Sequence, residues 1–139
     1  MAWTTPKTDW NELDFFNYAD NNRIVGNLDY LHELAITLFP PFEKEVMTYE
    51  NSYAAIPYAR KFMAIENNLE TINNETYNLN IGQKATFTIN GSTPLYVELN
   101  RIESACQRLY VQMKAHDDSR FHLAFKLGGD KIFNVTRES

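Results

Sequence analysis

The strongest constraint on the fold is a helical element that occurs twice in the sequence. Residues 18–24 and 96–102 each begin with Tyr, have an acidic residue two positions later and end in Asn-Arg-Ile. The match continues at an offset of about 78 residues through the pair Leu31 and Leu109. The helical period explains apolar matches between any two amphipathic helices, but it does not explain the shared Tyr, acidic, Asn and Arg residues. We expect two quasi-equivalent helices, in each of which the Arg reaches a neighbouring carboxylate or carbonyl group.

Apolar residues that alternate at steps of three and four predict three amphipathic helices, because this spacing places them on one helical face. Capping side chains and prolines that favour a first helical turn give the expected boundaries. The expected helices run from Asp14 to about Leu38, from near Pro57 to about Asn78, and from Thr93 to about His116. The signals in residues 42–53 conflict, and a loop or a short helix is expected there.

Alternation of apolar and polar residues predicts a small β element. A strand is expected near 84–90, where alternating residues meet the turn dipeptide Asn90-Gly91. The same alternation at 121–127 and 133–135, on either side of two glycines, predicts a C-terminal hairpin. The expected fold class is α+β: mostly helical, with a three-helix core and a small antiparallel β element.

A chain of 139 residues is long enough for one domain with its own core. The region before the first helix, residues 1–13, mixes Thr, Pro, Lys and Asp between two tryptophans and is expected to form an extended arm. Residues 14–139 are expected to form a single α+β domain, with the internal repeat at about 14–38 and 92–116.

The charge and the apolar pattern exclude several classes of partner. The net charge is −5 and the basic residues are scattered, so nucleic acid is not an expected partner. Neither a run of about 18 apolar residues nor a signal peptide is present, so no membrane association is expected. The single cysteine, Cys106, excludes an internal disulfide.

No residue pattern indicates catalysis. The three histidines lack metal-ligand spacing, and Asp117-Asp118 alone supplies too few oxygens for calcium. Cys106 falls on the apolar stripe of the third helix, where a thiol acts as a small hydrophobic group. We therefore expect no catalytic residue, no metal and no cofactor, and the chain is not expected to be an enzyme.

The N-terminal part is rich in aromatic residues that either cover the core of this chain or anchor it on a neighbouring subunit. An edge strand at 131–136 could likewise add to the sheet of another subunit. The expected interface residues are Trp3, Trp10, Phe15, Phe16, Tyr18, Arg23, Arg101 and Phe133.

The N-terminal region and the second copy of the helical element resemble a known class of proteins. Residues 7–10, which contain Thr-Asp-Trp, are followed by residues 14–17 and 20–27, and the helical element returns at 99–103. This order resembles recurring segments of tail and baseplate proteins of phages that infect Gram-positive bacteria. The resemblance covers about a quarter of the chain, and it departs from the repeat where Asn21 corresponds to Leu99.

The resemblance implies a non-catalytic virion structural protein, made in the host cytoplasm and located in the particle. As a tail or baseplate adaptor or accessory subunit, it would bind other virion proteins and copies of itself. One alternative is a module that binds host-surface carbohydrate, for which an exposed Trp3 or Trp10 would be the expected sugar platform. Another is a head-located accessory or fibre-attachment protein.

Overall fold

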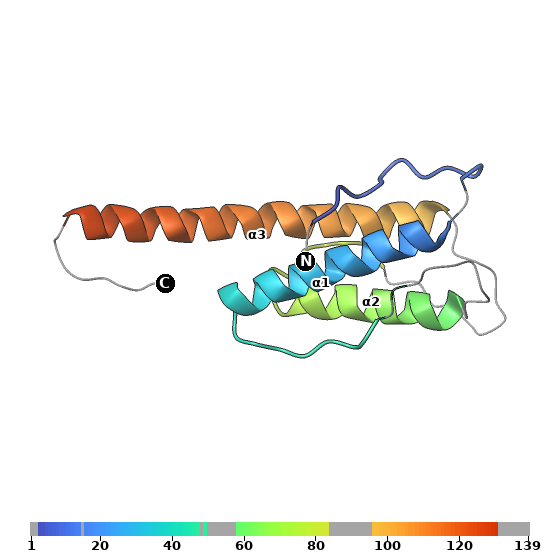
Figure 1. Cartoon of the computed structure of the whole chain (residues 1–139), viewed down its shortest axis with the longest axis horizontal. Helices are drawn as coiled ribbons and strands as arrows, with labels where there is room; N and C mark the ends of the chain where they lie inside the picture. The colour runs from blue at the N-terminus through green and yellow to red at the C-terminus, as the bar shows by residue number, and fades with distance from the viewer. Residues whose placement is uncertain (1–2, 15, 48, 50–57, 84–95, 131–139) are drawn as a thin grey trace.

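Three helices that run in the same direction form the main body of the described part of the chain. The computed structural model describes residues 3–14, 16–47, 49, 58–83 and 96–130, with only the helical backbone at 58–60 and 121–130. The helices are α1 (Tyr18–Leu38), α2 (Tyr58–Asn74) and α3 (Tyr96–Asp130). All three begin at one end of the bundle and run toward the other, and α3 continues well beyond the ends of α1 and α2 (Figure 1).

The core lies between the apolar faces of these helices, at the positions that the alternating spacing predicts. Its members are at most 4% exposed, and Ile24, Leu28, Ile102 and Leu109 are fully buried. The helical part of the core is Ile24, Val25, Leu28, Leu31, Ala35, Phe62, Ile65, Leu69, Ile72, Leu99, Ile102, Ala105, Cys106, Leu109 and Met113. The predicted apolar faces of the three helices are thus confirmed.

The first helix begins at a capping box rather than at Asp14. The Asn17 side chain accepts a hydrogen bond from the Asp20 N–H, and the Asp20 carboxylate accepts one from the Asn17 N–H, each at 3.0 Å. Asp14 instead closes a turn in which its N–H donates to the Asn11 carbonyl at 3.0 Å. The expected cap was wrong because a second capping residue, with an acid three positions later, follows Asp14 within three residues.

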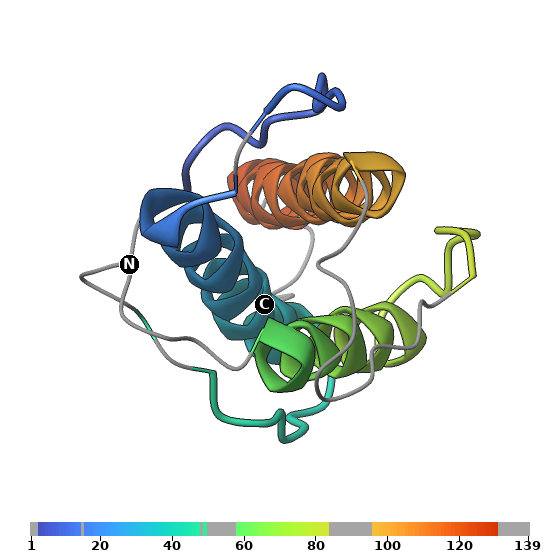
Figure 2. The same ribbon diagram turned by 90° about the vertical axis from the view of Figure 1, so that its right-hand side faces the viewer.

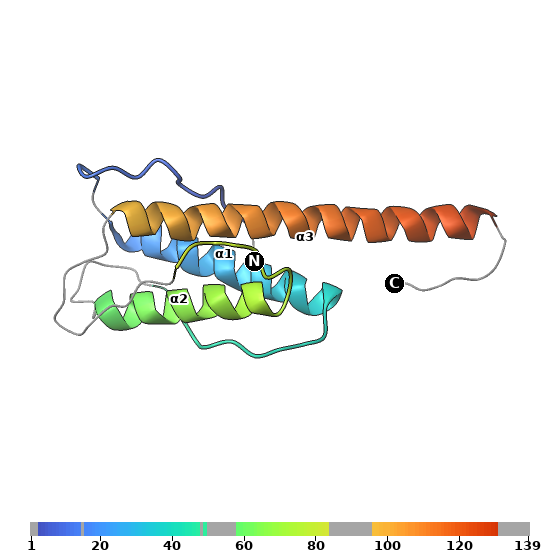
Figure 3. The same ribbon diagram turned by 180° about the vertical axis from the view of Figure 1, so that it is seen from behind.

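Parallel helices require chain segments that return to the starting end of the bundle, and these segments are extended. Residues 3–10, 39–47 and 77–83 each run alongside two helices, in the opposite direction to them (Figures 2 and 3). The helices that follow begin at Tyr18, Tyr58 and Tyr96, at spacings of 40 and 38 residues. The described chain therefore contains three units of one kind, an extended segment followed by a helix.

The expected α+β fold class is wrong for the described residues, which contain helices and no strand. Residues 121–130, expected to begin a hairpin, continue α3 to Asp130 instead of ending near His116. The alternating apolar residues 121–127 also satisfy the i, i+4 spacing of a helix, and extending an existing helix needs no new nucleus. The expected strand near 84–90 and the second half of the hairpin lie outside the described residues.

The second helix ends earlier than expected, at Asn74 rather than at Asn78. Asn78 adopts a left-handed conformation with φ of 52°, and its N–H donates to the Asn73 carbonyl at 2.8 Å. Such a residue closes a helix, and Asn tolerates this conformation better than most residues do. The following segment can then turn back toward α3.

Candidate functional site

The two arginines of the sequence repeat bind carboxylates of neighbouring helices. Arg23 of α1 donates from Nε and Nη2 to the two carboxylate oxygens of Glu103 in α3, at 2.9 and 2.6 Å, and from Nη1 to Asp20 at 2.9 Å. Glu103 is only 1% exposed. Burial alone would lower the pKa of Arg23, but hydrogen bonds and charges of Glu103 and Asp20 outweigh burial and raise it. The guanidinium therefore stays charged and links α1 to α3.

Arg101 repeats this arrangement one helix further around the bundle. It donates from Nη2 to Glu66 of α2, which is 1% exposed, and from Nε to Glu98 of its own helix at 3.0 Å. In both helices the arginine also forms an ion pair with the acidic residue three positions before it, Asp20 in α1 and Glu98 in α3. The predicted use of both arginines for carboxylate contacts is confirmed.

The register of the three helices shows that these contacts follow a cycle. The buried isoleucines Ile24, Ile65 and Ile102 have Arg immediately before them in α1 and α3, but Ala64 in α2. The residue after them is Glu in α2 and α3, but Val25 in α1. Each Arg reaches the Glu of the next helix, from α1 to α3 and from α3 to α2. The remaining step, from α2 to α1, has Ala64 and Val25 at these positions.

Four asparagines hold the extended segments on the helices. Each asparagine forms two hydrogen bonds with a single residue of an extended segment. Its amide oxygen accepts the backbone N–H of that residue, and its amide nitrogen donates to the carbonyl of the same residue. All these bonds measure 2.8 to 3.0 Å, and we call each pair of bonds an asparagine clamp. The clamps join Asn27 to Thr4, Asn100 to Trp10, Asn68 to Glu45, and Asn73 to Leu79. They satisfy backbone groups that have no strand partner among the described residues.

The aromatic arm packs on its own chain. Trp10 is 4% exposed and donates its indole N–H to Glu103 at 2.8 Å. Trp3 stacks on Tyr110 of α3 with ring centroids 4.0 Å apart, and Phe16 contacts Phe62 at 5.0 Å. Tyr18 is half-buried at the start of α1, whereas Phe15 and Phe133 lie outside the described residues. Of the two readings of the arm, these contacts favour a cover for the chain's own core.

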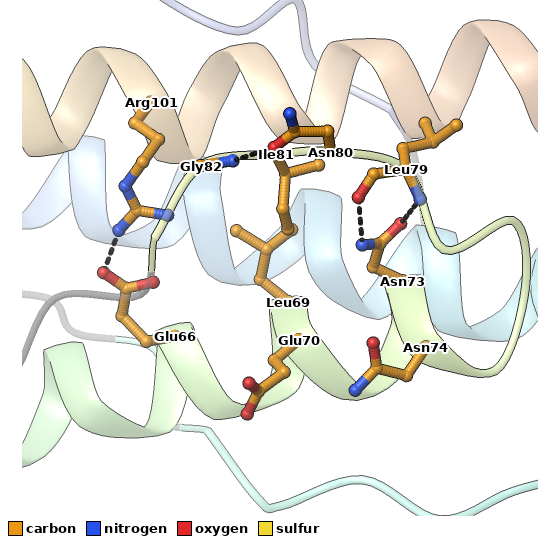
Figure 4. A pocket seen from close by; sticks show the side chains of 10 residues that line it. All are labelled: Glu66, Leu69, Glu70, Asn73, Asn74, Leu79, Asn80, Ile81, Gly82 and Arg101. Carbon is orange, nitrogen blue, oxygen red and sulfur yellow. Dashed lines mark hydrogen bonds and ion pairs between the residues drawn. The ribbon is translucent and has the colours of Figure 1, made fainter.

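A small pocket lies between α2, Arg101 and the third extended segment (Figure 4). Its volume is about 170 Å³, and its lining includes Glu66, Asn73, Leu79 and Arg101. Gly82 closes one side with φ of 87°, and a Cβ built there would lie 2.7 Å from Cδ of Arg101. Glu66, Asn73 and Arg101 in its lining already form the hydrogen bonds described above, so these groups have a structural role.

The far end of the bundle is closed by polar and aromatic groups around His116. The Tyr77 hydroxyl and Nδ1 of His116 are 2.8 Å apart, and the ring of Phe39 contacts the His116 ring edge-on at 5.4 Å. Arg120 donates to the carbonyl of Thr37, in the last turn of α1, at 3.3 Å. Beyond this level, no helix of the described chain lies beside the last ten residues of α3 (Figure 1).

This projecting segment, residues 121–130, continues the spacing of the core. The buried positions Leu109 and Met113 lead at steps of three and four to His116, Arg120, Leu123, Leu127 and Asp130. His116 and Arg120 stand where the bundle ends, Leu123 and Leu127 follow, and Asp130 closes the series. A stripe of this kind is typical of a helix that packs against another helix.

The described residues give no support for a reactive thiol, a metal site or a membrane-spanning helix. Cys106 is buried, and burial together with the charge of Glu103 raises the pKa of its thiol, which disfavours the nucleophilic thiolate. The described residues contain no group of three or more His, Cys, Asp or Glu side chains that could hold a metal ion. None of the described helices is long and apolar enough to cross a membrane.

Comparison with protein-family models, with curated proteins and with solved structures gives no match to this chain.

Sequence reasoning found the two arginines but missed three features of the site. It missed the buried partners Glu66 and Glu103, the asparagine clamps, and the projecting end of α3. The shared Ile-Glu dipeptide at 65–66 and 102–103 was a usable signal for the partners, as was Asn next to a core leucine at Asn27 and Asn68.

Proposed function

We propose that this chain is a non-catalytic structural subunit of a phage particle, an adaptor in or near the tail that joins protein subunits. The observation that carries the proposal is the projecting segment 121–130, which continues the core spacing of α3 beyond its own bundle. A helix with an apolar stripe and no helix beside it in the described part of the chain is suited to bind another protein.

The packing of the rest of the chain supports this assignment of roles. Arm residues Trp3 and Trp10 contact α3 of the same chain, and Arg23 and Arg101 hold the bundle together. A bundle fixed in this way is a rigid base, from which α3 extends by roughly 15 Å, ten residues at about 1.5 Å each. The element offered to a partner is thus helical and held in a defined direction.

The placement in a phage particle comes from the resemblance of residues 7–10, 14–17, 20–27 and 99–103 to tail and baseplate proteins. In this setting the partners are other virion proteins and further copies of the chain. The burial of Trp10 and the stacking of Trp3 on Tyr110 do not favour the alternative of a carbohydrate platform formed by these tryptophans.

Quantitative mass spectrometry of purified particles tests the proposal. Particles of the phage that encodes the chain are purified on a density gradient, and the chain is quantified against the major capsid protein. We expect a fixed copy number per particle that stays constant through a second gradient. Loss of the chain from the particles, while it remains abundant in infected cells, would overturn the proposal.

A further inference from the structure

We propose that the partner of the projecting segment is the same segment of a second copy, packed antiparallel across a twofold axis near position 125. This inference rests on the proposed assembly role and names the partner. It is carried by the residue series at the core-facing positions of α3, which is complementary to its own reverse.

The core series reaches the projecting segment without a break in spacing. Leu99, Ile102, Cys106, Leu109 and Met113 are buried against α1 and α2 at alternating steps of three and four. The same steps give positions 116, 120, 123, 127 and 130. A helix of a second copy that covers positions 120–130 would therefore continue the existing interface in line with the bundle, at the place where α1 ends.

The residues at these positions select the second copy and its direction. Positions 120, 123, 127 and 130 hold Arg, Leu, Leu and Asp. In an antiparallel pair centred at position 125, position 120 meets position 130 of the other copy, and position 123 meets position 127. Arg then faces Asp at both ends, and Leu faces Leu twice between them. A parallel pair would instead place Arg against Arg and Asp against Asp, which repel.

Arg120 is available for such a contact. Its side chain is 41% exposed, and its present contacts are long ones to Asp117 and to the Thr37 carbonyl, both at 3.3 Å. A twofold axis repeats every contact, so the contact between positions 120 and 130 and the contact between positions 123 and 127 each occur twice in the dimer. The pairing joins two bundles end to end into one rod.

Sedimentation equilibrium of the full chain over a range of concentrations tests the pairing. We expect a mass that rises from 16.2 kDa toward twice that value. Leu123→Asp together with Leu127→Asp should hold the mass at one chain at every concentration, with helix content preserved in circular dichroism. Val111→Asp is the matched control, since Val111 is on α3, 54% exposed and outside the pairing segment. It should leave the dimer unchanged.

Charge reversal tests the direction. Arg120→Asp or Asp130→Arg alone should raise the dimer dissociation constant roughly tenfold, since each places like charges at two symmetric contacts. The double reversal should restore the original value, because opposite charges face each other again. A single-chain mass for the unmodified protein at all concentrations, a dimer indifferent to the leucine changes, or no rescue by the double reversal would each overturn the antiparallel pair. The particle measurement above is independent of this result, so failure of the pairing and failure of the virion assignment can be told apart.

Discussion

Glu103 accepts hydrogen bonds from three residues in two separate parts of the chain, the arm and α1. Its carboxylate accepts from the Lys7 N–H at 3.0 Å, from the Trp10 indole at 2.8 Å and from Arg23 at 2.6 Å. The side chain is 1% exposed, so water does not replace a lost partner. This single residue therefore connects the arm, α1 and α3.

Glu103→Gln should lower the free energy of unfolding by about 3 kcal/mol, because it removes one of the two carboxylates that neutralise the largely buried Arg23 charge and leaves only Asp20. Glu98→Gln is the matched control, since Glu98 is 33% exposed and forms an i, i+3 pair with Arg101. It should change stability by less than about 0.5 kcal/mol. Urea unfolding followed by tryptophan fluorescence measures both. Equal losses for the two variants would contradict the central position given to Glu103.

Two glycines differ in what an added methyl group would meet. Gly82 has φ of 87° and a side-chain position 2.7 Å from Arg101, whereas Gly26 lies within α1 and would meet Tyr49 at an ordinary 3.7 Å. Gly82→Ala should therefore destabilise the fold by about 1 to 2 kcal/mol. Gly26→Ala should stabilise it by up to about 1 kcal/mol through helix propensity. Thermal unfolding of both variants decides, and a stabilising Gly82→Ala would refute the close approach to Arg101.

At the scale of elements, the extended segments depend on the asparagine clamps rather than on sheet pairing. Each clamp supplies one donor and one acceptor, which is what a neighbouring strand would supply to a single residue. Segment 39–47 illustrates the arrangement: Asn68 of α2 clamps Glu45, and Lys44 forms an ion pair with Asp29 of α1 at 2.6 Å. An extended segment can thus lie on two helices without belonging to a sheet.

Replacing Asn68 by Ala should release the second extended segment locally. The expected loss of stability is about 2 kcal/mol, because two partly buried hydrogen bonds to Glu45 disappear. Asn67→Ala is the control on the next position, since Asn67 donates one bond to the Glu45 carboxylate at 2.8 Å. Native-state hydrogen exchange should show a faster Glu45 amide in Asn68→Ala alone. An unchanged Glu45 amide would disprove the clamp.

The apolar faces of the helices could be predicted from the sequence, but the continuation of α3 through residues 121–130 could not. Core positions such as Ile24, Ile65 and Ile102 could be predicted because helical periodicity is local. Residues 121–127 were misread because alternating residues fit both a strand and a helix, and the helix that already precedes them decides the outcome. Context of this kind is not contained in the pattern itself.

The second structural unit was missed for a chemical reason. The first and third units share Arg23 and Arg101, but α2 has Ala64 at the corresponding position and retains only Glu66 of the ion-pair residues. The offset of about 78 residues is therefore twice the spacing between successive helices. The buried partners of the arginines could not be predicted, because which helices are neighbours is set by the return segments and not by the helices alone.

At the scale of the whole molecule, the three units form a bundle with one long helix extending from it (Figure 1). Ion pairs and asparagine clamps fix the bundle, and α3 offers its last three turns to another copy. In the proposed dimer, two such molecules join end to end through these turns.

The most direct measurement is the distance between two spin labels in the dimer, read by pulsed electron resonance. A label at Val111→Cys is exposed, whereas Cys106 is buried and burial raises the pKa of its thiol, so labelling is selective. Each label lies 14 residues from the axis at position 125, which predicts a separation of about 42 Å along the helices at about 1.5 Å per residue. The account predicts one distance between roughly 40 and 50 Å that vanishes when Leu123 and Leu127 are changed to Asp. A label separation below about 20 Å, or no coupling between labels at any concentration, would contradict it.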